Sequence, residues 1–137
     1  MNYYKKHSWF HFAVIVILCT AVSANCQIKK TILPDSLFST FYHQRVSHFR
    51  TLPLTKNDIV FVGNSITNGA EWAELFADNR IKNRGISSDV SAAVLNRIDE
   101  IAIRKPAKVF LLIGVNDLSR NISTDSIFKN IAKIVSY

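Results

Sequence analysis

A serine at position 65 lies where an α/β protein could place a nucleophile. It follows the apolar run at residues 59–62 and the glycine at position 63. Such a run is typical of a buried strand, and open α/β sheets bind their ligands at the carboxyl ends of their strands. The alternative is that Ser65 only caps the helix that follows. This turn by itself leaves both interpretations open.

Two more residues at expected strand ends are suited to acyl transfer. Gly85 follows a short strand expected at residues 80–83, and Asn116 follows a strongly apolar strand expected at residues 109–113. Because parallel strands end at one edge of a sheet, Ser65, Gly85 and Asn116 are expected to converge. Acyl transfer needs donors aimed at the oxygen where negative charge develops. A glycine N–H, the serine N–H and an asparagine NH₂ are such donors.

Gly85 and Asn116 also have purely structural interpretations. Gly85 can be a turn glycine, and Asn116 can brace its own loop by an Asx-turn. One residue seldom decides between such interpretations. Three candidates at three successive strand ends favour a site.

The elements that would position these residues alternate along the chain. Apolar residues at helical spacing predict helices before Pro53, near residues 71–76, at residues 90–101 and from about residue 124 onward. The expected caps are Asp35 or Ser36 for the first, one of residues 87–89 for the third, and Thr124 or Asp125 for the last. With the three strands, the order α-β-α-β-α-β-α predicts a parallel sheet in a layered α/β domain.

Composition and charge describe one globular domain. Of the 137 residues, 48% are hydrophobic and 20% are charged, which excludes a disordered chain. The formal net charge is +7, but the basic residues form no helix face or aromatic-interleaved patch. The sequence therefore indicates no nucleic-acid partner.

Residues 1–24 have the pattern of a secretory signal peptide. Two lysines precede an uncharged apolar run at residues 12–22, and small residues allow cleavage after Ala24. The run is shorter than a membrane-spanning helix requires. We expect residues 25–34 to form a leader, residues 35–137 to form the domain, and the mature protein to be secreted or periplasmic without a stable membrane span. An uncleaved N-terminal anchor and a lipid anchor on Cys26 are the alternatives.

The motifs resemble those of the SGNH (GDSL-type) hydrolase family, which is named for four separated blocks. Residues 63–67, 83–86 and 114–117 are similar to the first three blocks. The resemblance covers about residues 37–137 and is to the branch of the sialate O-acetylesterases and platelet-activating-factor acetylhydrolases. It implies a three-layer α/β/α fold of the flavodoxin-like type. It also implies a reaction without a metal or organic cofactor.

The resemblance also implies a mechanism and a class of substrate. Ser65 would be the nucleophile, and the Ser65 and Gly85 amides with the Asn116 side chain would form the oxyanion hole. The expected substrate is a short-chain acyl ester, of a small molecule or a glycan, with acetyl groups on carbohydrate favoured. The protein would then be a secreted serine esterase.

The sequence departs from the family pattern in two places. Asn64 stands where the first block usually has aspartate. The fourth block, Asp-x-x-His, is absent, because none of the seven aspartates has histidine three residues later. His43 and His48, both on the first expected helix, are not expected to reach Ser65. The general base and its orienting aspartate are therefore not present in this chain, and a serine hydroxyl without a base is a weak nucleophile.

These departures lead to expectations about the whole chain. The fold is expected to stop after the third strand and the following helix, which leaves an apolar strand at an exposed edge. The chain is then the front part of a longer hydrolase and inactive alone. One alternative is a non-catalytic glycan-binding or ligand-binding protein, or a decayed hydrolase fragment. Another is a nucleotide-binding domain, although residues 63–69 lack the Gly-Lys-Ser/Thr ending of a phosphate loop.

Overall fold

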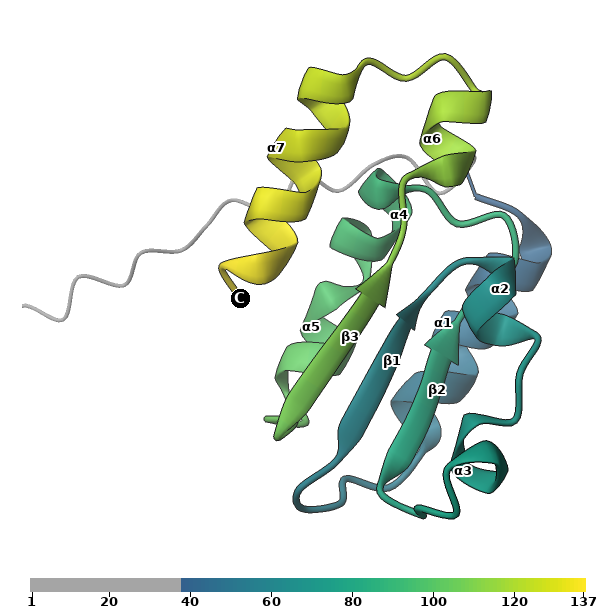
Figure 1. The fold of residues 1–137 in the computed structure, drawn as a ribbon, viewed down its shortest axis with the longest axis vertical. Coiled ribbons are helices and arrows are strands. Elements are labelled where there is room, and N and C mark those ends of the chain that lie inside the picture. The colour runs from purple at the N-terminus through teal and green to yellow at the C-terminus, as the bar shows by residue number, and fades with distance from the viewer. Residues whose placement is uncertain (1–37) are drawn as a thin grey trace, which may run out of the picture.

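A computed structural model of the chain describes residues 38–137, which are built around a parallel three-stranded sheet (Figure 1). The order is β2-β1-β3, so the first strand in the sequence is the central one. The strands are β1 (Ile59–Gly63), β2 (Ile81–Gly85) and β3 (Lys108–Leu112). Gly63 pairs with Gly85 on one side and with Leu112 on the other, so all three strands end at one edge of the sheet. The predicted signal peptide, leader and Cys26 lie outside the described residues.

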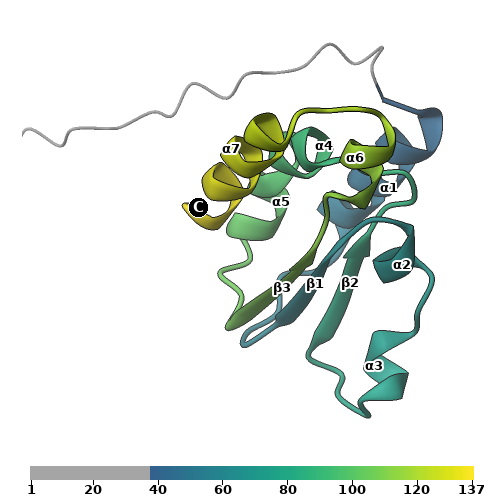
Figure 2. The ribbon, with the colours of Figure 1, turned by 45° about the horizontal axis from the view of Figure 1, so that its top comes forward.

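Seven helices connect and cover the strands in the described part of the chain. They are α1 (Thr40–Thr51), α2 (Ser65–Asn68), α3 (Trp72–Leu75), α4 (Ser91–Asn96), α5 (Ile98–Ala102), α6 (Val115–Ser119) and α7 (Thr124–Val135). Helices α1, α4, α5 and α7 lie on one face of the sheet, and α2 and α3 lie beside β2 (Figures 1 and 2). The Trp72 ring of α3 stacks on Phe61 of β1, with 4.9 Å between the ring centroids. The predicted α/β/α layering is confirmed, with the layer around α3 much the smaller.

The helix-covered face holds the apolar core. Val60 and Val62 of β1 are almost completely buried and pack with residues of α4, α5 and α7. The alternate residue Phe61 points to the other face and is only half-buried. A second cluster joins α1 to α4 and to Ile86 after β2. The sheet thus has one well-packed face and one thinly covered face.

Several predicted helix boundaries need correction. The helix predicted at residues 90–101 is divided in two near Arg97, and the region after Ser65 holds two short helices. α7 is capped by Ser123, since the Ser123 side chain accepts the N–H of Ser126. Ser39 caps α1 in the same way through Tyr42 N, and the caps predicted at residues 35 and 36 lie outside the described residues. Local patterns located the helices but not their ends, because several neighbouring polar residues can serve as the cap.

Buried ion pairs hold α1 and α5 against the sheet. Glu100 accepts from Arg84 of β2 at 3.1 Å and from Arg104 at 2.8 Å, and all three side chains are buried. Arg104 also donates to the carbonyl oxygens of Phe49 and Pro53 at the end of α1. These bonds satisfy carbonyl groups that a helix end leaves without partners.

Within residues 38–137, no helix is both long enough and apolar enough to cross a membrane.

Candidate active site

Ser65 is the first residue of α2 and follows β1 by a single residue. That residue, Asn64, is the N-cap: its side-chain oxygen accepts the N–H of Ile66 at 3.0 Å. The interpretation of Ser65 as a helix cap is therefore wrong, because Asn64 fills that role. Asn64 also keeps the acceptor that the usual aspartate would provide. Ser65 is exposed, and neither its hydroxyl nor its N–H has a hydrogen-bond partner among the described residues.

Gly63 allows α2 to begin directly above the end of β1. A Cβ at this position would overlap the Thr67 hydroxyl and would lie 2.5 Å from the carbonyl oxygen of Leu112. Both are closer than real Cβ contacts, so any side chain would displace either α2 or β3. A glycine here places Ser65 at the carboxyl edge of the sheet, at the start of a helix.

Gly85 has a structural role at the end of β2. A Cβ on Gly85 would overlap the backbone of Thr67 and Asn68, so the glycine lets α2 pack on β2. Its N–H donates to the side-chain oxygen of Asn83 at 2.8 Å. The oxyanion-donor role predicted for Gly85 stays a prediction, and this geometry disfavours it, because the N–H already has a partner.

Asn116 lies in α6 and reaches across to the loop after β2. Its side-chain nitrogen donates to the carbonyl oxygen of Asp89 at 2.8 Å. An Asx-turn needs the side-chain oxygen to accept an N–H of its own loop. The Asn116 side-chain oxygen accepts no hydrogen bond among the described residues, so the Asx-turn interpretation is wrong. A primary amide has two N–H groups. One is engaged with Asp89, and the other is available to a ligand.

The loop at residues 87–89 connects the serine helix with the asparagine helix. Asn68 of α2 contacts the Ser87 hydroxyl at 3.4 Å, and Arg120 donates to the carbonyl oxygen of Ser88 at 3.0 Å. Ser88 has a left-handed backbone with φ of 67°, which is uncommon for a residue other than glycine. The N–H groups of Ser87 and Ser88 have no hydrogen-bond partner among the described residues. The loop thus offers two free N–H donors, on Ser87 and Ser88. They lie next in sequence to Asp89, whose carbonyl oxygen accepts from Asn116.

Sequence reasoning missed this loop as part of the site. It assigned residues 87–89 to capping the next helix, but α4 begins at Ser91 and its N-cap, Val90, makes no side-chain cap bond. The loop directly follows the expected end of the second strand, and this position could have indicated that it belongs to the site. The left-handed conformation of Ser88 has no signature in its residue type.

Asn83 also received no role from the sequence, yet it fixes α2 in place. Its side-chain nitrogen donates to the carbonyl oxygens of Thr67 at 2.8 Å and Ala70 at 3.0 Å. The Trp72 ring N–H donates to the same Thr67 oxygen at 2.7 Å. These donors satisfy carbonyl groups at the end of the helix that carries Ser65. Backbone acceptors leave no trace in the sequence, so nothing in the pattern pointed to this role.

Asp89 carries the perturbed carboxyl group of the site. It is buried and accepts two bonds from Arg97, at 3.1 and 2.9 Å. Burial raises the pKa of Asp89 to about 6, and it outweighs the attraction of Arg97, which lowers the pKa. Near neutral pH the carboxylate is charged, and it holds the loop that presents the Asp89 carbonyl to Asn116.

No described residue is hydrogen-bonded to the Ser65 hydroxyl. The rings of His43 and His48 pack beside aromatic residues of α1, with His43 against Tyr42 and His48 against Phe49. The Ser65 hydroxyl bonds to neither histidine. Within residues 38–137, no three His, Cys, Asp or Glu side chains are grouped so that they could hold a metal ion.

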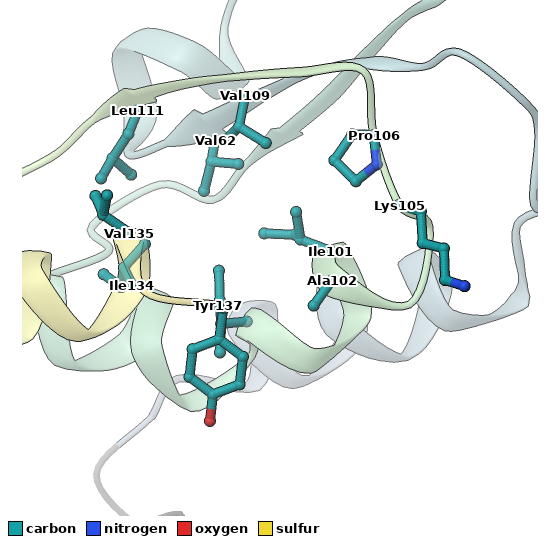
Figure 3. Close-up of a pocket in the computed structure, with 11 residues that line it drawn as sticks. Val62, Ile101, Ala102, Lys105, Pro106, Val109, Leu111, Ile134, Val135 and Tyr137 are labelled. Atoms are coloured by element: carbon teal, nitrogen blue, oxygen red, sulfur yellow. The ribbon is translucent and has the colours of Figure 1, made fainter. Parts of the chain in front are cut away.

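A cavity of about 460 Å³ lies away from these residues, on the helix-covered face (Figure 3). It opens between β3, α5 and the end of α7, where Val109 and Leu111 face Ile101 and Tyr137. Its lining is apolar apart from Lys105 and the Tyr137 hydroxyl, and it contains none of the predicted site residues. The convergent polar groups therefore lie at the carboxyl edge of the sheet and not in this cavity.

Comparisons with known proteins identify a family and a shared fold. The model of the GDSL-like lipase/acylhydrolase family matches residues 61–137. A solved structure from Streptococcus pneumonia, provisionally described as a platelet activating factor, shares the fold with a TM-score of 0.59 at 23% identity. The match covers 70% of this chain and 47% of that one, so the chain spans about half the length of that protein. A comparison with curated proteins gave no match.

Proposed function

This chain belongs to the GDSL-like lipase/acylhydrolase family, and from that membership we propose that Ser65 is the nucleophile of a secreted serine esterase. The family supports ester hydrolysis in general. The observation that carries the assignment of Ser65 is its free hydroxyl and free N–H at the carboxyl edge of the sheet. Asn64 does the capping, so the hydroxyl has no structural task.

The proposed reaction has two steps. The Ser65 oxygen attacks the ester carbonyl carbon, its proton passes to a general base, and the alcohol leaves. Water then attacks the acyl-enzyme and releases the carboxylic acid and the free serine. The described residues offer no base to Ser65, so we expect slow turnover by the chain alone.

The proposed oxyanion hole uses the Ser65 N–H and the second N–H of the Asn116 side chain. Both are neutral donors that can point at the developing charge before the reaction starts. The sequence suggested Gly85 as a third donor. The engaged N–H of Gly85 makes the free N–H groups of Ser87 and Ser88 better candidates in this structure.

The proposed substrates are short acyl esters, with acetyl groups on carbohydrate preferred. This preference is supported by the resemblance of the three motifs to the sialate O-acetylesterase branch. Hydrolysis of nitrophenyl acetate, butyrate and octanoate by the full chain measures the acyl preference. Release of acetate from an acetylated xylan measures the carbohydrate preference. A higher kcat/KM for octanoate than for acetate would contradict the proposal.

The nucleophile is tested with a fluorophosphonate that labels activated serines. Because the described residues offer Ser65 no base, we expect slow labelling of the full wild-type chain. We expect no labelling of Ser65→Ala. Ser136→Ala is the matched control, because Ser136 is an exposed serine at the end of α7, and we expect its labelling to equal that of wild type. Label that persists in Ser65→Ala would show that another residue reacts.

A second candidate function is binding of acylated glycans without turnover. The observation in its favour is the Ser65 hydroxyl without a base among the described residues. The two candidates separate in one experiment. Saturable binding of an acetylated oligosaccharide by calorimetry, with no labelling of wild-type Ser65, would favour the binding protein.

A further inference from the structure

A buried acid directly follows Asn116 and has no part in the proposed reaction. Asp117 is completely buried, and its two carboxylate oxygens accept the N–H of Ser91 at 3.0 and 2.9 Å. The Ser91 hydroxyl donates to the same carboxylate at 2.6 Å. Ser91 is the first residue of α4. A side chain of α6 thus binds the start of a helix that precedes it in the chain.

Helix α4 depends on this contact because its own N-cap cannot provide one. Val90 has no side-chain oxygen to accept an N–H. Free N–H groups at a helix start favour a negatively charged acceptor, and Asp117 provides it from another segment. Asn130 of α7 donates to the Ser91 hydroxyl at 2.9 Å. Ser91 therefore joins three helices in a buried network.

Asn116 makes the adjacent contact to the same segment. Its side-chain amide donates to the Asp89 carbonyl, two residues before Ser91. Asp89 is itself held by Arg97. Two consecutive residues of α6 therefore hold residues 89 and 91. With one N–H of the amide fixed on Asp89, the direction of its second N–H is also fixed.

We propose that Asp117 is a positioning residue that fixes the side-chain amide of Asn116. The inference rests on the proposed function, in which that amide donates to the oxyanion. A donor contributes most when it is held in place before charge develops, because no reorganisation is then needed. Loss of the Asp117–Ser91 contact frees the first turn of α6 from α4, and the Asn116 amide then rotates away from Asp89.

Heteronuclear NMR of the side-chain amide of Asn116 in the full chain tests this role. Its resonances are identified by their loss in Asn116→Ala. In wild type, we expect the two amide protons to resonate far apart, because only one is bonded to Asp89. In Asp117→Ala, we expect the two resonances to approach each other. The bonded proton should exchange with water about tenfold faster, the order expected for loss of one hydrogen bond.

Two further variants make the result specific. Ser91→Ala keeps the Ser91 N–H on Asp117 and removes the hydroxyl contacts to Asp117 and Asn130. It should shift the Asn116 resonances in the same direction by a smaller amount. Ile98→Val loosens the core near β1 and α4 without touching α6, so it should lower the Tm and leave Asn116 unchanged. Unchanged Asn116 resonances in Asp117→Ala overturn the proposal. If Asp117→Ala does not fold, unchanged resonances in Ser91→Ala overturn it.

The experiment separates the failure of this inference from failure of the proposed function. The NMR readout needs no turnover, so an Asn116 amide that moves in Asp117→Ala supports the positioning role even if Ser65 takes no fluorophosphonate label. Absence of label on wild-type Ser65 would contradict the esterase alone. Where hydrolysis is measurable, Asp117→Ala should lower kcat and leave KM unchanged, because the donor acts mainly in the transition state.

Discussion

The two edges of the sheet differ sharply in how they are covered. At the β2 edge, α2 and α3 pack on the strand, and Asn83 and Gly85 lock α2 in place by a hydrogen-bond network and a close backbone approach. At the β3 edge, Val109, Phe110 and Leu112 are each about half exposed. The expectation that the third strand would be an apolar edge strand is confirmed by the order β2-β1-β3.

The two edges of the sheet contribute differently to the protein: one is stabilised by packing and the other leaves apolar side chains exposed. The covered edge fixes the helix that carries Ser65 by packing and hydrogen bonds, so the candidate nucleophile lies on the well-packed side of the sheet. The open edge offers apolar side chains and strand backbone groups that no described element covers, and such an edge favours association. Variants at the two edges should therefore change different properties: stability on the β2 side and association on the β3 side.

The largest effect is expected for Gly85→Ala at the covered edge. The new Cβ would overlap the backbone of α2 at Asn68, and backbone cannot move aside as a flexible side chain can. We expect a loss of about 3 kcal/mol or more in the free energy of unfolding, measured by urea denaturation. Gly69→Ala is the control, since its Cβ would meet only the Ser65 carbonyl at 3.2 Å, and it should stay within about 1 kcal/mol. Equal losses would contradict the close packing of α2 on β2.

The next effect is a pH dependence carried by Asp89, in the loop after β2. Burial raises the pKa of its carboxyl group to about 6 in the folded chain, above the ordinary value near 3.8. The stability that it contributes is therefore complete below pH 3.8 and is lost as the pH rises through 6. Between pH 4 and 7, wild type should lose on the order of 2 kcal/mol relative to Asp89→Asn.

Asp78 serves as the control for that experiment because its shift has the opposite sign. Hydrogen bonds from Arg80 lower the pKa of Asp78 to about 2. Its contribution is present above the ordinary pKa and is lost as the pH falls towards 2. Urea midpoints of Asp78→Asn should therefore follow wild type between pH 5 and 7. A wild type whose stability does not fall relative to Asp89→Asn would contradict the raised pKa.

A smaller loss is expected for Asn83→Ala, which removes the bonds that hold the end of α2. The carbonyl groups of Thr67 and Ala70 and the N–H of Gly85 each lose a partner. We expect a loss of about 1–2 kcal/mol, because solvent can replace part of these contacts. Asn79→Ala, an exposed asparagine whose side chain makes no hydrogen bond within the described residues, should unfold at the wild-type urea midpoint.

The smallest effect on stability is expected at the open edge. Leu112→Lys places a charge on an exposed position of β3, and the free energy of unfolding should change by less than about 0.5 kcal/mol. Association should fall, because a lysine on an edge strand opposes strand pairing. Sedimentation velocity over a range of concentrations measures this. A large loss of stability in Leu112→Lys would show that the β3 edge is as tightly built as the β2 edge.

The family resemblance and the order of elements could be read from the sequence because their signals are local. Buried strands appear as short apolar runs, and helices appear as apolar residues at helical spacing. The alternation of the two implied a parallel sheet, and a parallel sheet brings the ends of its strands to one edge. The placement of Ser65 and Asn116 at that edge followed from position alone.

Tertiary structure decided how each of these residues is used. The Gly85 N–H is engaged by Asn83, the Ser65 hydroxyl is relieved of capping by Asn64, and α4 is capped by Asp117 from another segment. A hydrogen bond depends on which groups the folded chain brings within about 3 Å of each other. Periodicity in the sequence reports which face of an element is buried, and it carries no information about which distant polar group will be there.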